Sequence, residues 1–337
     1  LPNFNSGVIT RAADSFRTPY YLYSVDGVKA NIKRLMSSLP TTFELAMSLK
    51  ANPNPHLLAN LCKDIEWLDI ASLGELYLGK IAGVSVSNML FIGPGKTRTD
   101  IDIAIKFGIG LIVVESIEEL RIVDELSEEA DTCTSILIRV NPTAGVAPTD
   151  IQMSGCSSQF GIDEEQLIHA LTLVKNLRHV VFKGIHVYMG SQILDASQLY
   201  NNFESILRLA NTIFHDQGID LSIVDFGGGF GVPYFEHEQA IDLQVLGEKI
   251  SRLFDIEAKE LVDNGCRFIV ESGRYLLADA GVFVAKVLYK KKSMGTDYLV
   301  LDGGSNYHST LSGMGKIVRQ NFPFSVINQS SSLSHST

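Results

Sequence analysis

The chain has 337 residues, of which 45% are hydrophobic and 20% charged, and its net charge is −10 at pH 7. This composition is ordinary for a globular enzyme, and the acidic balance argues against a nucleic-acid partner, which would favour a basic face. No run of 18 apolar residues appears, so no membrane span is predicted. The four cysteines are far apart and form no CxxC pair, which fits a reducing, cytoplasmic setting.

The first 25 residues contain the aromatic run Tyr20–Tyr23 and precede a long series of strand-like segments. Eight short apolar runs then follow, and each ends in a polar or glycine-rich cluster. Strict alternation of such runs with helical patterns indicates a parallel sheet that is covered on its outer side. The eight runs are residues 43–49, 67–71, 89–92, 111–114, 135–140, 182–187, 221–224 and 267–270.

Helical patterns of suitable length lie between these runs. Ser116 has Glu119 three residues later, which is a capping-box pattern at a helix start. An open doubly wound sheet is the main structural alternative, because alternation alone does not close a barrel. The count of eight strands and the absence of an early G-x-G-x-x-G favour a (β/α)8 TIM barrel. The predicted helices are residues 56–63, 73–83, 99–107, 116–129, 163–177, 196–217 and 243–264.

The pattern changes after Arg274. Residues 280–289 and 298–301 read as strands with no helix between them, which predicts antiparallel pairing across a basic turn, Lys290 to Lys292. We therefore expect three parts: residues 1–25 packing with a β domain, a barrel at 26–276, and a C-terminal β domain at 277–337. Its Ser-rich tail, residues 329–337, is predicted to be unstructured.

In such a barrel the carboxyl ends of all strands meet at one face, where the chemistry occurs. Lys50 ends the first run, and burial among apolar residues would depress its pKa toward that of a Schiff-base nucleophile. A lysine that extends to the surface is the alternative. Gly227, Gly228 and Gly229 follow the seventh run, where barrels often bind phosphate, although tight turns also use glycine.

Glu271 and Arg274 end the eighth run. They are either a structural ion pair or have separate roles, with Arg274 neutralising a phosphate and Glu271 binding a protonated ring nitrogen. Arg139 and His186 also point toward the barrel mouth, although each alone is more often structural. A lysine, a phosphate cradle and an acid together specify pyridoxal 5'-phosphate (PLP) chemistry.

Lys96 and Thr97 follow Gly95 in a segment that superficially looks like a nucleotide-binding loop. The G-x-x-x-x-G-K-[ST] spacing is absent, so we reject a nucleotide site there.

Six segments resemble motifs of the fold-type III PLP-dependent decarboxylases, which include diaminopimelate and ornithine decarboxylases. The resemblance covers about residues 18–310 and implies a barrel of the alanine-racemase type followed by a β domain. Within the family, the sequence variants look most like the butirosin-pathway and siderophore-pathway decarboxylases. The segments are 48–53 (SLKANP), 91–96 (FIGPGK), 158–162 (SQFGI), 184–192 (GIHVYMGSQ), 227–231 (GGGFG) and 271–275 (ESGRY).

The resemblance also implies roles for individual residues. Lys50 would carry PLP and Glu271 would keep its pyridine nitrogen protonated, while Tyr188 stands where the family usually stacks a histidine on the ring. Lys50, Glu271, Tyr188 and His186 are thus the expected catalytic residues. Those expected to bind the cofactor are Lys50, Asp69, Arg139, Tyr188, Ser191, Gly227, Gly228, Gly229, Glu271, Gly273 and Arg274.

The function implied is removal of the α-carboxylate from an L-amino acid or an amino-acid conjugate by a homodimer. An amino-acid racemase on the same fold is an alternative, although such racemases place an arginine where this chain has Glu271. The other alternative is a PLP-binding inactive or regulatory paralogue. It is suggested because the sequence ends at Thr337, before the second half of the family's β domain, and we therefore expect a truncated or split protein.

Overall fold

The computed structural model describes residues 4–143, 157–308 and 322–327. The predicted unstructured tail, residues 329–337, lies outside these ranges. The chain divides into two compact units, of which the larger comprises Lys29–Val232 and Ala240–Leu277 and the smaller comprises Leu1–Val28, Pro233–Gln239 and Ala278–Thr337. Among the described residues, no helix has both the length and the apolar character needed to cross a bilayer.

The larger unit is built on a closed ring of eight parallel strands, in the order β5-β4-β3-β2-β10-β9-β8-β6, and pairing of β5 with β6 closes the ring. Each of the eight predicted runs overlaps one strand. The barrel prediction is therefore confirmed, and the open doubly wound sheet is excluded. The strands are β2 (Phe43–Ser48), β3 (Trp67–Ile70), β4 (Met89–Phe91), β5 (Leu111–Val114), β6 (Thr134–Asn141), β8 (Val180–His186), β9 (Ile223–Asp225) and β10 (Arg267–Ser272), and the two-residue β7 (Ile162–Asp163) adds to β6.

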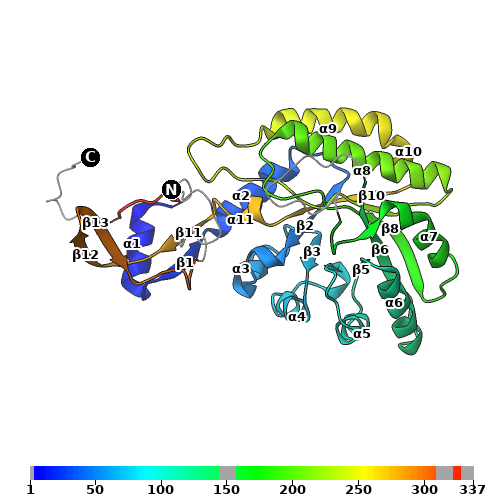
Figure 1. Ribbon diagram of the computed structural model, residues 1–337, viewed down its shortest axis with the longest axis horizontal. Coiled ribbons are helices and arrows are strands. Elements are labelled where there is room, and N and C mark those ends of the chain that lie inside the picture. Colours follow the sequence, from blue (N-terminus) through cyan, green and yellow to red (C-terminus); the bar gives the residue numbers. More distant parts are fainter. Residues whose placement is uncertain (1–3, 144–156, 309–321, 328–337) are drawn as a thin grey trace. The chain divides into compact units, whose positions relative to one another are not determined.

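Helices cover the outside of this ring, with α8 and α9 side by side and α3 to α6 following one another in chain order (Figure 1). The single helix predicted for residues 243–264 is wrong, because the helix breaks at Ala258, where no glycine or proline marks the break in the sequence. The helices are α2 (Val25–Met36), α3 (Pro55–Ala59), α4 (Leu73–Ile81), α5 (Arg98–Lys106), α6 (Ile117–Glu129), α7 (Glu164–Val174), α8 (Ala196–Asp216), α9 (Leu243–Glu257), α10 (Lys259–Asp263) and α11 (Arg274–Leu277), with 3-10 turns η1 (Leu49–Ala51) and η2 (Val86–Asn88).

The capping box predicted for α6 is half present. Ser116 accepts the N–H of Glu119 at 3.1 Å, but the Glu119 carboxylate accepts the N–H of Glu115 instead of that of Ser116. A complete capping box begins α5, where Thr97 and Asp100 bond reciprocally. Because of this different hydrogen bond, Glu119 in α6 is connected to Glu115 at the end of β5.

Inward-facing side chains from most of the strands fill the barrel. Because side chains alternate along a strand, the residue two positions after an inward-facing one also faces inward. Near the carboxyl ends of the strands, the inward-facing residues are polar instead of apolar, and they form a polar layer above the apolar core. The apolar residues are Ala46, Trp67, Leu90, Ile92, Leu111, Val113, Leu137, Ile223 and Ile269. The polar residues two positions further on are Ser48, Asp69, Glu115, Arg139, Asp225 and Glu271.

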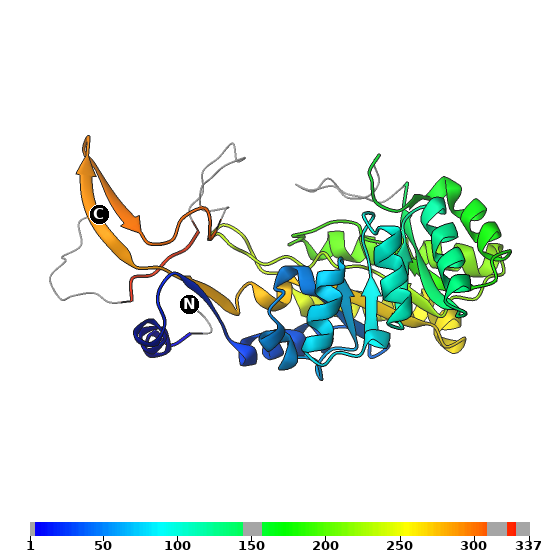
Figure 2. The ribbon, with the colours of Figure 1, turned by 90° about the horizontal axis from the view of Figure 1, so that it is seen from below.

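The smaller unit contains α1 (Ser6–Ser15) and two strand pairs. β1 (Tyr20–Tyr23) pairs antiparallel with β11 (Gly281–Val284), and β12 (Val287–Ser293) pairs antiparallel with β13 (Thr296–Leu301), as Figure 2 shows. The antiparallel pairing predicted across the turn is confirmed for β12 and β13, but the single strand predicted for residues 280–289 is wrong, because that segment divides into β11 and β12. The predicted turn at Lys290 to Lys292 is wrong, because these lysines lie within β12. Met294 and Gly295 form the turn, and both have the positive φ that a two-residue hairpin needs.

Candidate active site

Lys50 lies on η1, the single turn that follows β2, and its side chain is 54% exposed. Its Nζ is 2.7 Å from Oδ2 of Asp69, which is buried at the end of the neighbouring strand β3. Partial burial acts to lower the pKa of Lys50, but the Asp69 and Glu271 carboxylates outweigh it and raise the pKa. The expectation of a depressed pKa in apolar surroundings is therefore wrong. The amine is instead held as an ammonium beside a proton acceptor.

Asp69 is itself perturbed. Burial raises the pKa of its carboxyl group, the Glu271 charge raises it further, and Lys50 acts against both. Asp69 consequently holds a proton more readily than an exposed aspartate does, which suits a group that exchanges a proton with Lys50.

His186 and Glu271 form a second pair on the inner side of the barrel, with His186 Nε2 3.1 Å from Glu271 Oε1. Both side chains are almost completely buried. Burial acts to raise the pKa of Glu271, but His186, Lys50 and Arg139 together lower it to about 2. Glu271 is therefore an ionised carboxylate at neutral pH, as an acid that binds a protonated ring nitrogen must be.

Asp225, at the end of β9, was not assigned a role from the sequence. It is completely buried, and burial together with the Glu271 charge raises the pKa of its carboxyl group well above the usual value. Its Oδ1 accepts the N–H of Gly227 at 2.9 Å, while its Oδ2 has no hydrogen-bond partner in the part of the chain that the structure describes. Asp225, His186 and Glu271 each offer a ligand-type atom within 4.8 Å of the others.

The three glycines after β9 pack tightly against neighbouring backbone. A Cβ at Gly227 would lie 2.7 Å from Val187 O, and one at Gly228 would lie 2.7 Å from Glu271 O. Gly227 and Gly229 also have positive φ, which favours glycine. Among the described residues, no protein acceptor bonds the N–H groups of Gly228 and Gly229. Those two groups can therefore donate to an anion.

Tyr188 lies against this glycine segment, since a Cβ at Gly227 would be 2.9 Å from its ring. Burial raises the pKa of its hydroxyl group, while a hydrogen bond with Ser191 and the charges of Lys50 and Arg274 act against the rise. Tyr188 thus forms a hydrogen bond with Ser191 and lies within the electrostatic influence of Lys50 and Arg274.

Arg139 and Gly273 complete the predicted set. Arg139 is buried, and its Nη1 lies 3.0 Å from Glu115 Oε1. Its guanidinium carbon lies 6.0 Å from the centre of the Tyr188 ring. A Cβ at Gly273 would come 2.7 Å from Ala51, so this glycine lets β10 approach the Lys50 turn. The residues singled out from the sequence therefore gather at the carboxyl ends of the strands.

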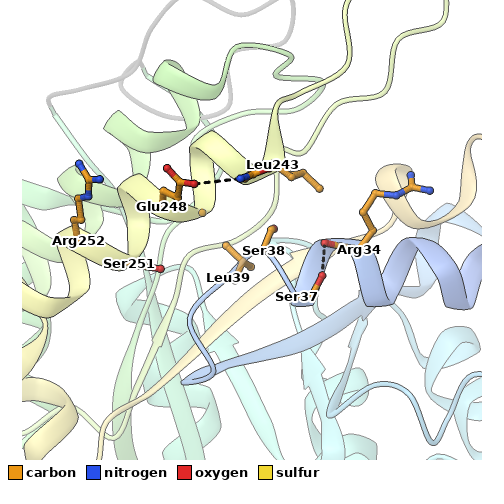
Figure 3. Close-up of a pocket in the computed structure, with 10 residues that line it drawn as sticks. Arg34, Ser37, Ser38, Leu39, Leu243, Glu248, Ser251 and Arg252 are labelled. Atoms are coloured by element: carbon orange, nitrogen blue, oxygen red, sulfur yellow. Dashed lines mark hydrogen bonds between the residues drawn. The ribbon is translucent and has the colours of Figure 1, made fainter.

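A surface pocket of about 600 Å³ lies elsewhere, between the end of α2 and the start of α9 (Figure 3). Arg34, Ser38, Glu248 and Arg252 are among its lining residues. None of the predicted site residues lines it, because the segment after α2 leads into the amino end of β2. The chemistry predicted from the sequence therefore does not belong to this pocket.

Sequence reasoning missed Asp225 and Glu115 as members of the site. Both were visible as the polar residues that end strand-like runs. The period of two from Ile223 and Val113 of the barrel core places both on the inner side. Their position at a strand end is the signal in the sequence that marks these two carboxylates.

The residues fit PLP on observations of the chain alone. Lys50 supplies an accessible amine, Glu271 supplies a buried negative charge, and Gly228 and Gly229 supply N–H groups for which the described residues provide no acceptor. PLP needs these three functions for its aldehyde, its ring nitrogen and its phosphate.

Comparison with known proteins gives the same result. The family described as "Pyridoxal-dependent decarboxylase, pyridoxal binding domain" matches residues 25–278. The L-glutamyl-[BtrI acyl-carrier protein] decarboxylase of Niallia circulans is 38% identical, over 96% of this chain and 76% of that protein. A Staphylococcus aureus enzyme, 2-[(L-alanin-3-ylcarbamoyl)methyl]-2-hydroxybutanedioate decarboxylase, is 28% identical, over 87% of this chain and 72% of its own length.

Among solved structures, diaminopimelate decarboxylase from Helicobacter pylori complexed with L-lysine superimposes with a TM-score of 0.80 at 27% identity. The match covers 90% of this chain and 75% of that chain. The predicted fold, cofactor and reaction class are thereby confirmed. The chain belongs to the pyridoxal-dependent decarboxylase family, as an enzyme whose cofactor is pyridoxal 5'-phosphate.

Proposed function

We propose that this decarboxylase removes the α-carboxylate at the carboxyl face of its barrel, with Lys50, Glu271, Tyr188 and His186 as its catalytic residues. The observation that carries the proposal is the ionised Glu271, buried beside His186 at the same strand ends as the Lys50–Asp69 pair. When bound, PLP supplies an electron sink for the electron pair left on the α-carbon when CO2 departs. An ionised Glu271 strengthens such a sink because it favours the protonated form of a ring nitrogen.

We assign Lys50 and Asp69 to the handling of a proton. An ammonium cannot attack an aldehyde, so Lys50 Nζ must first release a proton. Asp69 Oδ2 is 2.7 Å away, and burial makes Asp69 a better base than an exposed aspartate. Asp69 can therefore take the proton and return it to the amine.

The remaining predicted residues bind and orient. Gly227, Gly228, Gly229, Ser191 and Arg274 are proposed to hold the phosphate, and Gly273 to let β10 approach the lysine turn. Arg139 and Tyr188 lie together on the other side of the glycines from β10, where they can contact cofactor or substrate. Residues 26–276 are the proposed PLP-binding domain, with residues 1–25 packing against the β domain at 277–337.

The proposed substrate is an amino-acid conjugate that presents a free α-amino acid end. Two relatives bear names of this kind, one acting on a glutamyl group attached to an acyl-carrier protein and the other on an alanine-derived carbamoyl conjugate. L-glutamyl thioesters should therefore be better substrates than meso-diaminopimelate or L-ornithine. We further propose a cytoplasmic homodimer, which analytical ultracentrifugation and cell fractionation would test.

The decisive experiment combines cofactor capture with product analysis. Wild-type protein incubated with PLP should develop the absorbance of lysine-bound cofactor and release CO2 from one of the three substrates. Lys50→Ala should lose both, whereas Lys29→Ala, which removes a surface lysine paired with Asp64 at 3.2 Å, should lose neither. Formation of a D-isomer without CO2 would indicate a racemase. Cofactor capture without turnover of any substrate would indicate an inactive paralogue.

A further inference from the structure

Glu115 is a buried carboxylate that follows β5 on the inner side of the barrel. It receives hydrogen bonds from three separate segments: Arg139 Nη1 at 3.0 Å, the N–H of Gly93 at 2.8 Å and the N–H of Gly161 at 3.2 Å. Gly93 follows β4, Arg139 lies in β6, and Gly161 precedes β7. One carboxylate thus joins three neighbouring segments at the barrel mouth.

The backbone of Glu115 is also fixed by a hydrogen bond. Its N–H donates to Glu119 Oε2 at 2.8 Å, and Glu119 Oε1 lies 2.7 Å from Nζ of the buried Lys96. Lys96 also donates to the carbonyls of Val113 and Gly93. The segment that superficially looked like a nucleotide-binding loop therefore provides a buried cation that fixes the base of α6.

Arg139 gains a defined orientation from these contacts. A free arginine side chain has about 2 kcal/mol of rotamer entropy, so a site that uses its guanidinium gains from having it fixed in advance. Phe160 covers one part of the guanidinium, with its ring centre 4.7 Å from Cζ, and the Tyr188 ring centre lies 6.0 Å away. Glu115 holds Nη1, which keeps the group beside Tyr188.

We propose that Glu115 is the positioning residue for Arg139, which it holds so that the guanidinium meets an anionic oxygen of the cofactor or of the substrate. The proposal rests on the proposed function only for the identity of that ligand. If the anionic oxygen belongs to PLP, loss of Glu115 weakens cofactor binding. If it belongs to the substrate, cofactor binding is unchanged and KM rises.

A double-mutant cycle tests this coupling. Glu115→Gln, Arg139→Lys and the double variant are prepared as apoprotein, and the PLP dissociation constant is measured by absorbance titration, followed by KM and kcat. Each single substitution should weaken PLP binding or raise KM by about tenfold or more, because contacting pairs couple by amounts of that order. In the Arg139→Lys background, the further change caused by Glu115→Gln should be less than about twofold. Equal factors in both backgrounds would overturn the proposal.

The matched control is Glu44→Gln, which removes another barrel carboxylate that bonds Trp67 Nε1 at 2.6 Å and faces Arg267 at 3.4 Å. A purely structural role for Glu115 predicts that both substitutions lower the unfolding temperature and leave PLP affinity and KM alone, which contradicts the proposal. If Glu115→Gln does not fold, Glu115→Asp is used instead, because aspartate keeps the negative charge but its side chain is one methylene shorter. Failure of wild-type protein to bind PLP would instead refute the proposed function.

Discussion

His186 Nε2 lies 3.1 Å from Glu271 Oε1, inside the barrel and out of contact with solvent. An isolated carboxylate in this position would take up a proton, because burial disfavours its charge. The pKa of Glu271 is nevertheless lowered to about 2, and after the opposing effect of burial His186 is the largest cause. The charge on Glu271 therefore depends on a residue 85 positions away in the chain.

Replacing His186 with glutamine should weaken cofactor binding. Glutamine can still donate a hydrogen bond to Glu271 but does not reproduce the electrostatic effect of the imidazole, so the pKa of Glu271 should rise and its hold on a protonated ring nitrogen should weaken. The PLP dissociation constant, measured by absorbance titration of the apoprotein, should increase about tenfold, the factor that corresponds to one pKa unit of weakened interaction.

The control for this substitution is His215→Gln, since His215 faces Glu260 at 3.7 Å on the surface. Surface pairs contribute little, so this variant should bind PLP as the wild type does. Equal PLP affinity in His186→Gln and the wild type would show that the charge on Glu271 is set by other neighbours.

Substituting Asp69 with asparagine should change the pH dependence of cofactor capture. Asp69 is the nearest group that raises the pKa of Lys50, so its neutralisation should lower that pKa and free the amine at lower pH. In Asp69→Asn apoprotein, the midpoint of the capture rate against pH, followed by stopped-flow absorbance, should move down by about one unit or more. Asp64→Asn, which affects the surface pair with Lys29, should leave the midpoint in place. An unchanged midpoint in Asp69→Asn would show that Asp69 does not raise the pKa of Lys50 in the folded protein.

The sequence was sufficient to predict the barrel because each strand can be recognised from a short segment of sequence. Each apolar run is short and ends in turn or polar residues, so all eight strands could be located without knowing their partners. The alternation of side chains also predicts the polar layer, since Asp69 and Glu271 each lie two residues beyond an inward-facing apolar residue. Position at a strand end, together with family resemblance, therefore led to the residues that are proposed as the site.

The pairing within the site could not be predicted from the sequence. Lys50 was expected among apolar residues, whereas it stands beside Asp69, and the sign of its pKa shift depends on that neighbour. The Glu115–Arg139 pair likewise depends on how β5 and β6 close the ring. Such contacts join residues from different strands, and no local pattern records which side chains meet.

Neutralising Asp225 should stabilise the protein at neutral pH. Its folded-state pKa is raised well above the ordinary value of 3.8, so the folded protein binds a proton that the unfolded chain releases. Stability from this group is therefore fully present below about pH 4 and is lost as pH rises through the raised pKa. Asp225→Asn keeps an oxygen for the Gly227 N–H and removes this loss.

The free energy of unfolding, from urea denaturation, should thus be higher in Asp225→Asn than in wild type at pH 7 by about 1 kcal/mol or more, the equivalent of one pKa unit. The difference should vanish near pH 4. A wild type that is the more stable of the two at pH 7 would mean that Asp225 is ionised and paired in the folded state.

β8 and β9 lie unusually close together at Gly184, and this spacing determines the position of His186 relative to its partners. Gly184 lies two residues before His186, has φ +149, and a Cβ on it would lie 1.7 Å from Ile223 O. No side-chain rotation relieves a clash between a Cβ and backbone, so Gly184→Ala must push the two strands apart. The free energy of unfolding should fall by about 3 kcal/mol or more, in the range caused by severe backbone conflict.

Gly74→Ala is the matched control for Gly184→Ala. Gly74 lies in α4, where the nearest atom to an added Cβ is 3.7 Å away, and alanine favours a helix over glycine by about 1 kcal/mol. Its free energy of unfolding should stay level or rise. In Gly184→Ala, displaced strands should also separate His186 from Glu271, so PLP affinity should fall together with stability. A stable variant with intact PLP affinity would show that the barrel tolerates a wider spacing between these strands.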